Sequence, residues 1–263
     1  MKRFIIEQSD EEFYTSTSGI SLVGMALNRF TNLSPSLAKA VPLSHGISHA
    51  DVIRSFCALL AQGKSDFVAI EQHREDDFFR EALGLKQVPS EATLRQRMDD
   101  HATEFLQAVS WSIIEFLMKT EVPLTPLSTG HIAVDIDGFA MDNSGTKKEC
   151  VSRTYRNFDG YLAMPVYLAN EGWLIECSLL PGSQHPQKAF NPFLQRALAK
   201  IRQISKDKLL LRADSAHDAV ANRVELSRHD DVDYIIKWNP RKQDPEVWKA
   251  EAFAKGKVET PRP

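Results

Sequence analysis

Two short apolar segments that each end on an aspartate constrain the fold of this chain more than any other feature. Residues 131–137 read His-Ile-Ala-Val-Asp-Ile-Asp, and residues 209–214 read Leu-Leu-Leu-Arg-Ala-Asp. Short apolar runs followed by small or loop-forming residues are typical of strands buried in a sheet. Ligands of open α/β sheets bind beyond the carboxyl ends of the strands. The segments therefore predict a sheet with Asp137 and Asp214 at its ligand-binding edge.

The two aspartates come close together if their strands are neighbours, because adjacent strands lie ~4.8 Å apart. Like charges at such a separation repel unless a positive charge lies between them, and a divalent cation is the usual solution. The same pattern is also compatible with two ordinary strand-end aspartates. Spacing alone leaves both interpretations open.

Composition restricts the class of protein. The 263 residues are 43% hydrophobic and 25% charged, which is typical of a soluble globular chain with one large domain or two smaller ones. No apolar run approaches the ~18 residues of a membrane span, and the start does not resemble a signal peptide. The three cysteines lie far apart, which fits reduced thiols and offers no zinc site. We therefore expect a cytoplasmic protein with no membrane partner.

The charge distribution excludes a uniformly basic surface. Residues 1–130 hold 12 Lys and Arg against 17 Asp and Glu, and residues 131–263 hold 20 against 18. Any nucleic-acid binding must therefore depend on local basic patches.

The hydrophobic pattern divides the chain into a helical part, residues 1–127, and a mixed α/β part, residues 128–263. Gly63 and Gly84 are placed to end helices, and Ser90 is placed to cap one. Residues 22–30 fit a strand or a short helix equally well. The predicted helices of the first part cover residues 48–62, 66–83, 91–98 and 103–119.

In the second part, strands and helices are expected in the order β-β-β-α-β-α-β. The turn at 170–172 predicts an antiparallel pair, and the handedness of crossovers places the fourth strand beside the first. A polar tail follows the last strand. The predicted strands cover residues 131–137, 161–168, 173–180, 208–213 and 234–238, and the helices cover 191–204 and 217–228.

Three blocks of sequence together resemble the DDE transposases of bacterial insertion sequences, in the branch that carries a β-domain insertion. They are residues 88–98 (Val-Pro-Ser-Glu-Ala-Thr-Leu-Arg-Gln-Arg-Met), 134–138 (Val-Asp-Ile-Asp-Gly) leading to Tyr155 and Gly160-Tyr161, and 211–218 (Leu-Arg-Ala-Asp-Ser-Ala-His-Asp). The similarity runs from about Gly84 to Arg241. It implies a ribonuclease-H-like core after an α-helical N-terminal domain.

The resemblance also implies a chemistry. Members of this family hold two Mg²⁺ ions, for which Mn²⁺ can substitute, with two Asp and one Glu. By that likeness Asp137 is the first acid and Asp214 the second. Asp135 is a rival for the first position and a candidate metal ligand, because alternation along a strand puts it on the same face as Asp137. It can instead pair with a basic neighbour.

The implied partners are the terminal inverted repeats of an element, target DNA and further copies of the chain, in a bacterial cytoplasm near the nucleoid. For His217 and Asp218, capping at a helix start is preferred to metal binding. Surface arginines on a helical bundle and a solvated basic loop are the alternatives to DNA binding. The candidate DNA-binding residues are Arg95, Arg97, Lys147, Lys148, Arg153, Tyr155, Lys237 and Arg241.

The chain departs from the family at the third acid, a Glu preceded by Tyr and Arg on a late helix. No such arrangement follows Asp214, and Glu225 lies too near to it. We therefore expect an incomplete, C-terminally truncated core that is inactive alone. The main alternative is a non-catalytic protein that binds DNA ends and represses an intact transposase. A host nuclease or resolvase of the same fold and a metal-free α/β protein are further alternatives.

Overall fold

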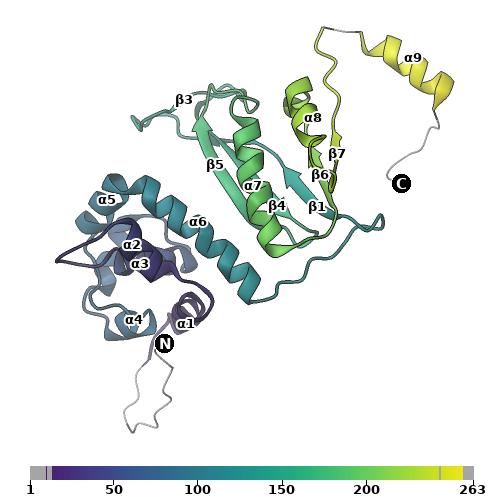
Figure 1. Cartoon of the computed structure of the whole chain (residues 1–263). Helices are drawn as coiled ribbons and strands as arrows, with labels where there is room; N and C mark the ends of the chain where they lie inside the picture. The colour runs from purple at the N-terminus through teal and green to yellow at the C-terminus, as the bar shows by residue number, and fades with distance from the viewer. Residues whose placement is uncertain (1–9, 11–13, 243, 257–263) are drawn as a thin grey trace. The chain divides into compact units, whose positions relative to one another are not determined.

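The computed structural model describes residues 10, 14–242 and 244–256. It divides into two compact units. Among these described residues, the helical unit comprises those up to residue 123 together with 200–205, and the sheet unit comprises residues 124–199 together with those from residue 206 onward. Figure 1 shows the helical unit in purple to blue and the strands of the sheet unit in teal to yellow-green.

The helical unit packs short helices around one apolar core. Leu37, Leu59, Ile70, Phe79 and Leu94 are fully buried in this core. The described helices are α1 (Ile20–Phe30), α2 (Leu33–Ala40), α3 (His49–Ala61), the 3₁₀ helix η1 (Phe67–His73), α4 (Asp77–Ala82), α5 (Glu91–Asp100) and α6 (Ala102–Lys119).

Local capping explains where several of these helices begin. The side chain of Ser48 accepts a hydrogen bond from the N–H of Asp51 at 3.0 Å, and that of Ser90 accepts one from the N–H of Thr93 at 3.2 Å. The predicted helices over 48–62, 91–98 and 103–119 are therefore confirmed as α3, α5 and α6. Residues 22–30, for which a strand was also considered, lie in helix α1.

The single helix predicted over residues 66–83 is wrong. The structure has η1 and α4 in that range, separated at residues 74–76. Asp76 adopts an extended conformation there, and its side chain accepts a hydrogen bond from the N–H of Phe79 at 2.9 Å. A new N-terminal cap thus interrupts an apolar pattern that would otherwise continue as one helix.

The sheet unit contains one mixed sheet of seven strands within its described residues. β4 pairs antiparallel with β1, β2, β3 and β5, whereas β1 and β6 are parallel, as are β6 and β7. The strands are β1 (Ile132–Ile136), β2 (Phe139–Asp142), β3 (Ser152–Arg153), β4 (Asp159–Leu168), β5 (Trp173–Pro181), β6 (Leu209–Ala213) and β7 (Val232–Ile236).

The main strands lie in the spatial order β5-β4-β1-β6-β7, antiparallel at the start of the chain and parallel later. This arrangement is ribonuclease-H-like, and the predicted fold class is confirmed. The short strands β2 and β3 were not predicted. β2 and β1 pair with successive parts of β4, and so do β3 and β5. The last strand was predicted two residues too late.

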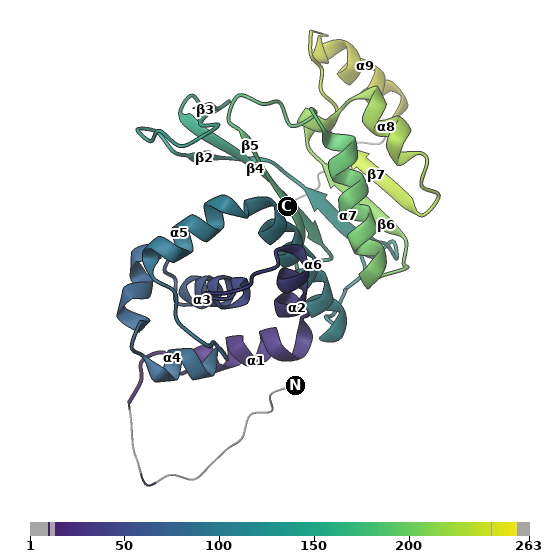
Figure 2. The ribbon, with the colours of Figure 1, turned by 60° about the vertical axis from the view of Figure 1, so that its left-hand side comes forward.

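Helices cover one face of this sheet. Figures 1 and 2 show α7 (Phe190–Ile204) lying along the strands. Phe193, Leu194 and Ala197 of α7 are buried, and Gln195 donates a hydrogen bond to Glu225 of α8 (Val220–Leu226) at 2.8 Å. The face that carries Asp135 is more open. Asp135 pairs with Arg212 on β6, Arg212 pairs with Ile235 on β7, and the side chain of Ile235 is exposed.

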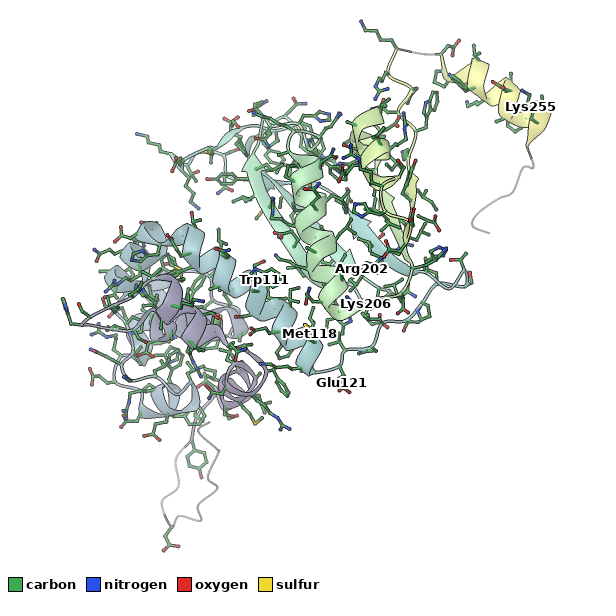
Figure 3. All side chains as sticks on the ribbon, viewed as in Figure 1. Trp111, Met118, Glu121, Arg202, Lys206 and Lys255 are labelled. Atoms are coloured by element: carbon green, nitrogen blue, oxygen red, sulfur yellow. The ribbon has the colours of Figure 1, made fainter. Side chains whose placement is uncertain are left out.

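The polar tail contains a helix that the sequence analysis did not predict, α9 (Pro245–Lys255). Asp244 caps it and Pro245 occupies its first turn, a combination that favours helix initiation. Figure 3 shows Lys255 near its end, where it pairs with Glu251. None of the helices in the described residues is long and apolar enough to span a membrane.

Candidate active site

Asp137 and Asp214 directly follow two neighbouring parallel strands. The register between β1 and β6 pairs Ile136 with Ala213, and the next residue of each strand is one of the two aspartates. Since adjacent strands lie ~4.8 Å apart, the chain leaves the sheet at two neighbouring points, each marked by a carboxylate. This is the edge at which α/β sheets bind ligands.

Each of these carboxylates is held by a backbone N–H of its own turn. Oδ1 of Asp137 accepts from Gly138 at 2.8 Å, and Oδ1 of Asp214 accepts from Ala216 at 3.0 Å. The second bond caps the short 3₁₀ helix η2 (Ser215–His217). Asp137 is exposed and the side chain of Asp214 is 48% exposed. Both carboxylates can therefore be reached by a ligand from solvent.

A buried imidazole lies beside the second acid. His217 is fully buried, its ring is 4.5 Å from the ring of Phe190, and its Nε2 is 3.8 Å from Oδ1 of Asp214. Burial lowers the pKa of His217, an effect that the negative charges of Asp214 and Asp137 oppose.

Asp135 is held by a basic neighbour on the adjacent strand. Nε of Arg212 donates to Oδ1 of Asp135, and Nη2 donates to Oδ2, both at 2.6 Å. The hydrogen bond to Asp135 raises the pKa of Arg212. With both oxygens of Asp135 engaged, its arrangement favours pairing with a basic neighbour over metal binding.

The glutamates that follow Asp214 in the described residues form contacts away from the two aspartates. Glu225 is buried and accepts hydrogen bonds from Gln195 and Arg228, while Glu246 and Glu251 pair with lysines on α9. Glu259 lies outside the described residues. Within the described part of the chain, no three His, Cys, Asp or Glu residues form a group suited to a metal ion.

The predicted basic loop lies between β2 and β4. Lys147 and Lys148 are exposed, and Arg153 on β3 is 3.7 Å from Asp159. Tyr155 is 60% exposed, and the guanidinium of Arg156 lies 5.3 Å from the centre of its ring. The loop thus presents an aromatic ring and several cations on one short segment.

Lys237 and Arg241 follow β7 but differ in their surroundings. The backbone N–H of Lys237 donates to the carbonyl of Ala213 at 3.1 Å, so its side chain starts next to the strand end that carries Asp214. Arg241 donates to the backbone oxygen of Asp218. Arg241 therefore has a structural contact that a phosphate would have to replace.

Arg95 and Arg97 also differ, although both lie on α5. Arg95 donates to Glu91 at 2.8 Å, which raises its pKa, and lies 5.5 Å from the ring of Phe67. Arg97 has no carboxylate within 4 Å among the described residues and lies close to Gly46.

The predicted capping roles of His217 and Asp218 are wrong. Asp214 caps η2, and Ala219 precedes α8 without a side-chain cap. Asp218 is buried and instead accepts hydrogen bonds from Arg223 and from the backbone of Asn239. Its carboxylate thus joins two loops, a long-range contact that local sequence does not reveal.

Arg212, which stands two residues before Asp214, is a site residue that the sequence pattern also indicates. The alternation that placed Asp135 on the face of Asp137 also places Arg212 on the face of Asp214. That signal was present in the segment Leu-Leu-Leu-Arg-Ala-Asp.

One comparison with known proteins identifies the family of this chain. A model of the family described as Transposase DDE domain group 1 matches residues 8–249. No curated protein matches the sequence. Among solved structures, the chain is similar to piggyBac transposase in a synaptic complex with hairpin DNA, at 10% identity and a TM-score of 0.40, over 100% of this chain and 48% of that one.

Two structures of Mos1 transposase are also similar. The paired-end complex with the left transposon end shows 14% identity and a TM-score of 0.30, over 84% of this chain and 70% of that one. The strand transfer complex shows 13% identity and a TM-score of 0.28, over 95% and 87%. The chain spans about half the length of the piggyBac transposase. Because the family match covers nearly all of its residues, the chain belongs to the DDE transposase family, in the group described as Transposase DDE domain group 1.

Proposed function

We propose that this chain is a transposase that cuts and joins the ends of its element by two-metal phosphoryl transfer, with Asp137 and Asp214 as metal-binding carboxylates. Hydrolysis adds water across a phosphodiester at the element end and frees a 3′-hydroxyl. In strand transfer, that hydroxyl attacks a phosphodiester of target DNA and displaces a second 3′-oxygen. The same site serves both steps, because each exchanges one oxygen ligand of phosphorus for another.

The observation that carries this proposal is the parallel register of β1 and β6, in which Ile136 and Ala213 are paired directly before the two aspartates. This pairing brings together two residues that are 77 positions apart in sequence. The family match supports assigning this edge of the sheet to DNA chemistry.

The donor set fits Mg²⁺, with Mn²⁺ as a substitute. Mg²⁺ prefers oxygen ligands, and it is commonly held by one or two carboxylates, waters and substrate phosphates. Asp137 and Asp214 each use Oδ1 in a backbone hydrogen bond and lie at exposed strand ends. When bound, a pair of such ions activates the attacking water and stabilises the leaving oxygen.

DNA is the proposed partner, as element ends and as target. In this proposal residues 1–127 bind DNA ends through Arg95 and Arg97, and residues 128–263 form the catalytic core. The loop after β2 is proposed to contact DNA through Lys147, Lys148, Arg153 and Tyr155, because exposed cations and an aromatic ring suit phosphates and bases. Lys237 and Arg241 are proposed to contact the phosphate backbone near Asp214. Assembly of further copies on paired ends is part of the same proposal.

A second candidate is a protein that binds DNA ends without cutting them and thereby represses an intact transposase. It is favoured by one observation: no third His, Cys, Asp or Glu joins Asp137 and Asp214 in a metal-binding group within the described residues. In this case the chain alone is inactive and the helical unit carries the function.

The test is to incubate the full chain with DNA that contains the element ends, in the presence of Mg²⁺ or Mn²⁺. The proposed function predicts nicking that Asp137→Ala and Asp214→Ala abolish. Asp142→Ala is the matched control, because Asp142 is exposed on β2 and its side chain bonds only to Ser144 of its own turn among the described residues. Binding without nicking supports the repressor. Nicking indifferent to the end sequence, or unchanged in both aspartate variants, contradicts the proposed function.

A further inference from the structure

We propose that Asp135 and Arg212 form a cross-strand clamp that sets the separation of Asp137 and Asp214, so that Asp135 is a positioning residue. This inference rests on the proposed function of the two acids, since the clamp acts only through them. It assigns a role to Arg212 that neither the resemblance nor the family match provides.

The clamp joins the two strands that carry the acids. Asp135 and Arg212 are direct partners in the parallel register, two residues before Asp137 and Asp214 respectively. Both hydrogen bonds between them measure 2.6 Å and use different oxygens and different nitrogens. A bidentate arginine–carboxylate pair of this kind restricts the relative orientation of its partners more than a single contact does.

The anchors of the acids themselves do not cross between the strands. Asp137 is bonded to Gly138 and Asp214 to Ala216, each within its own turn. The clamp lies ~7 Å away, at a rise of ~3.4 Å per residue, on the same face of the sheet. The clamp thus connects β1 and β6 through side chains, two residues before the proposed metal-binding edge.

The clamp also removes a competing charge. A free carboxylate at Asp135 would repel Asp137 and could attract the cation away from the strand ends. Arg212 neutralises it and occupies both of its oxygens. Of these three aspartates, only Asp137 and Asp214 therefore keep a carboxylate oxygen without a hydrogen bond to the protein.

This role is geometric, because an exposed ion pair adds little to stability. The side chains of Arg212 and Asp135 are 42% and 37% exposed. Variants of the pair should therefore fold, which far-UV circular dichroism and thermal unfolding can verify. A change in metal binding by such folded variants then reports on the position of the acids.

The experiment measures Mn²⁺ affinity of the full chain by electron paramagnetic resonance of the free ion. We expect Arg212→Gln, Arg212→Lys and Asp135→Asn each to weaken binding by about 10-fold, as for other residues that orient metal ligands. The exchanged pair, Asp135→Arg with Arg212→Asp, should restore most of the affinity. Asp233→Asn is the matched control, because Asp233 pairs with His131 at the opposite end of the same sheet.

Any other outcome contradicts the proposed role of the clamp. Tighter binding by Arg212→Gln would make Asp135 itself a ligand that Arg212 restrains. Unchanged binding by the single variants, no recovery in the exchanged pair, or equal weakening by Asp233→Asn would remove its positioning role. A wild-type chain that binds no Mn²⁺ would overturn the proposed metal site as well, whereas the other results would overturn the clamp alone.

Discussion

The backbone N–H of Asn239 donates a hydrogen bond to Oδ2 of Asp218 at 3.0 Å. This bond connects the segment after β7 with the turn after β6, which begins at Asp214. Asp218 is buried, and its carboxylate also accepts from Arg223. One side chain thus joins the segments that follow the two parallel strands.

Replacing Asp218 by Ala should lower the free energy of unfolding by about 1–3 kcal/mol, because it leaves the N–H of Asn239 and the guanidinium of Arg223 without their acceptor. Urea unfolding followed by circular dichroism measures this change. Asp230→Ala is the control; Asp230 is exposed, and its loss should cost less than about 0.5 kcal/mol. Equal effects of the two variants would contradict the connecting role of Asp218.

A second prediction concerns the contact between α1 and α4. A Cβ atom on Gly24 would lie 1.9 Å from the carbonyl oxygen of Ala82, so the two helices must move apart in Gly24→Ala. We expect a loss of about 1–3 kcal/mol, the usual effect of overpacking a core. Gly19→Ala is the matched control, because nothing lies within 4 Å of a Cβ there. A thermal unfolding temperature that is the same for both variants would disprove this close approach.

A third prediction separates two arginines of α5 and rests on the proposed DNA binding. Arg97→Gln should weaken binding to end-containing DNA and reduce the salt dependence by about one phosphate contact. Arg95→Gln should have a smaller effect, because Arg95 already bonds to Glu91 and would have to exchange that partner for a phosphate. Fluorescence anisotropy at several salt concentrations measures both. A larger effect of Arg95→Gln would place the DNA on the other side of α5.

A fourth prediction concerns pH. Burial lowers the pKa of His49 below 6.5, and Arg97 and His101 lower it further. Below pH 6.5 the unfolded chain therefore binds a proton that the folded chain does not, so stability falls as the pH decreases from 6.5 toward the folded-state pKa.

His49→Gln should reduce this dependence when urea unfolding is compared at about pH 7.5 and about pH 5.5. Ser55→Ala is the control, because it changes another buried side chain of α3 without removing a titratable group. A pH dependence that is identical in wild type and His49→Gln would contradict the buried, neutral state of His49.

Local patterns predicted the elements whose signals lie within a few residues. Ser48 and Ser90 mark the starts of α3 and α5 because a side-chain cap acts over three residues. Two other local signals were not predicted, namely the cap at Asp76, which divides residues 66–83, and the Asp244-Pro245 start of α9. β2 and β3 were not predicted because two to four mostly exposed residues carry no clear period and form strands only through pairing with β4.

The sequence by itself determined the fold class and the two segments that end on Asp137 and Asp214, since apolar runs and turn residues are local properties. Only the tertiary structure decided that Ile136 pairs with Ala213, that Arg212 holds Asp135, and that Asp218 joins the loops after β6 and β7. Each of these contacts links residues brought together by strand pairing and crossovers. Their energies depend on distances in space, which the order of residues along the chain does not specify.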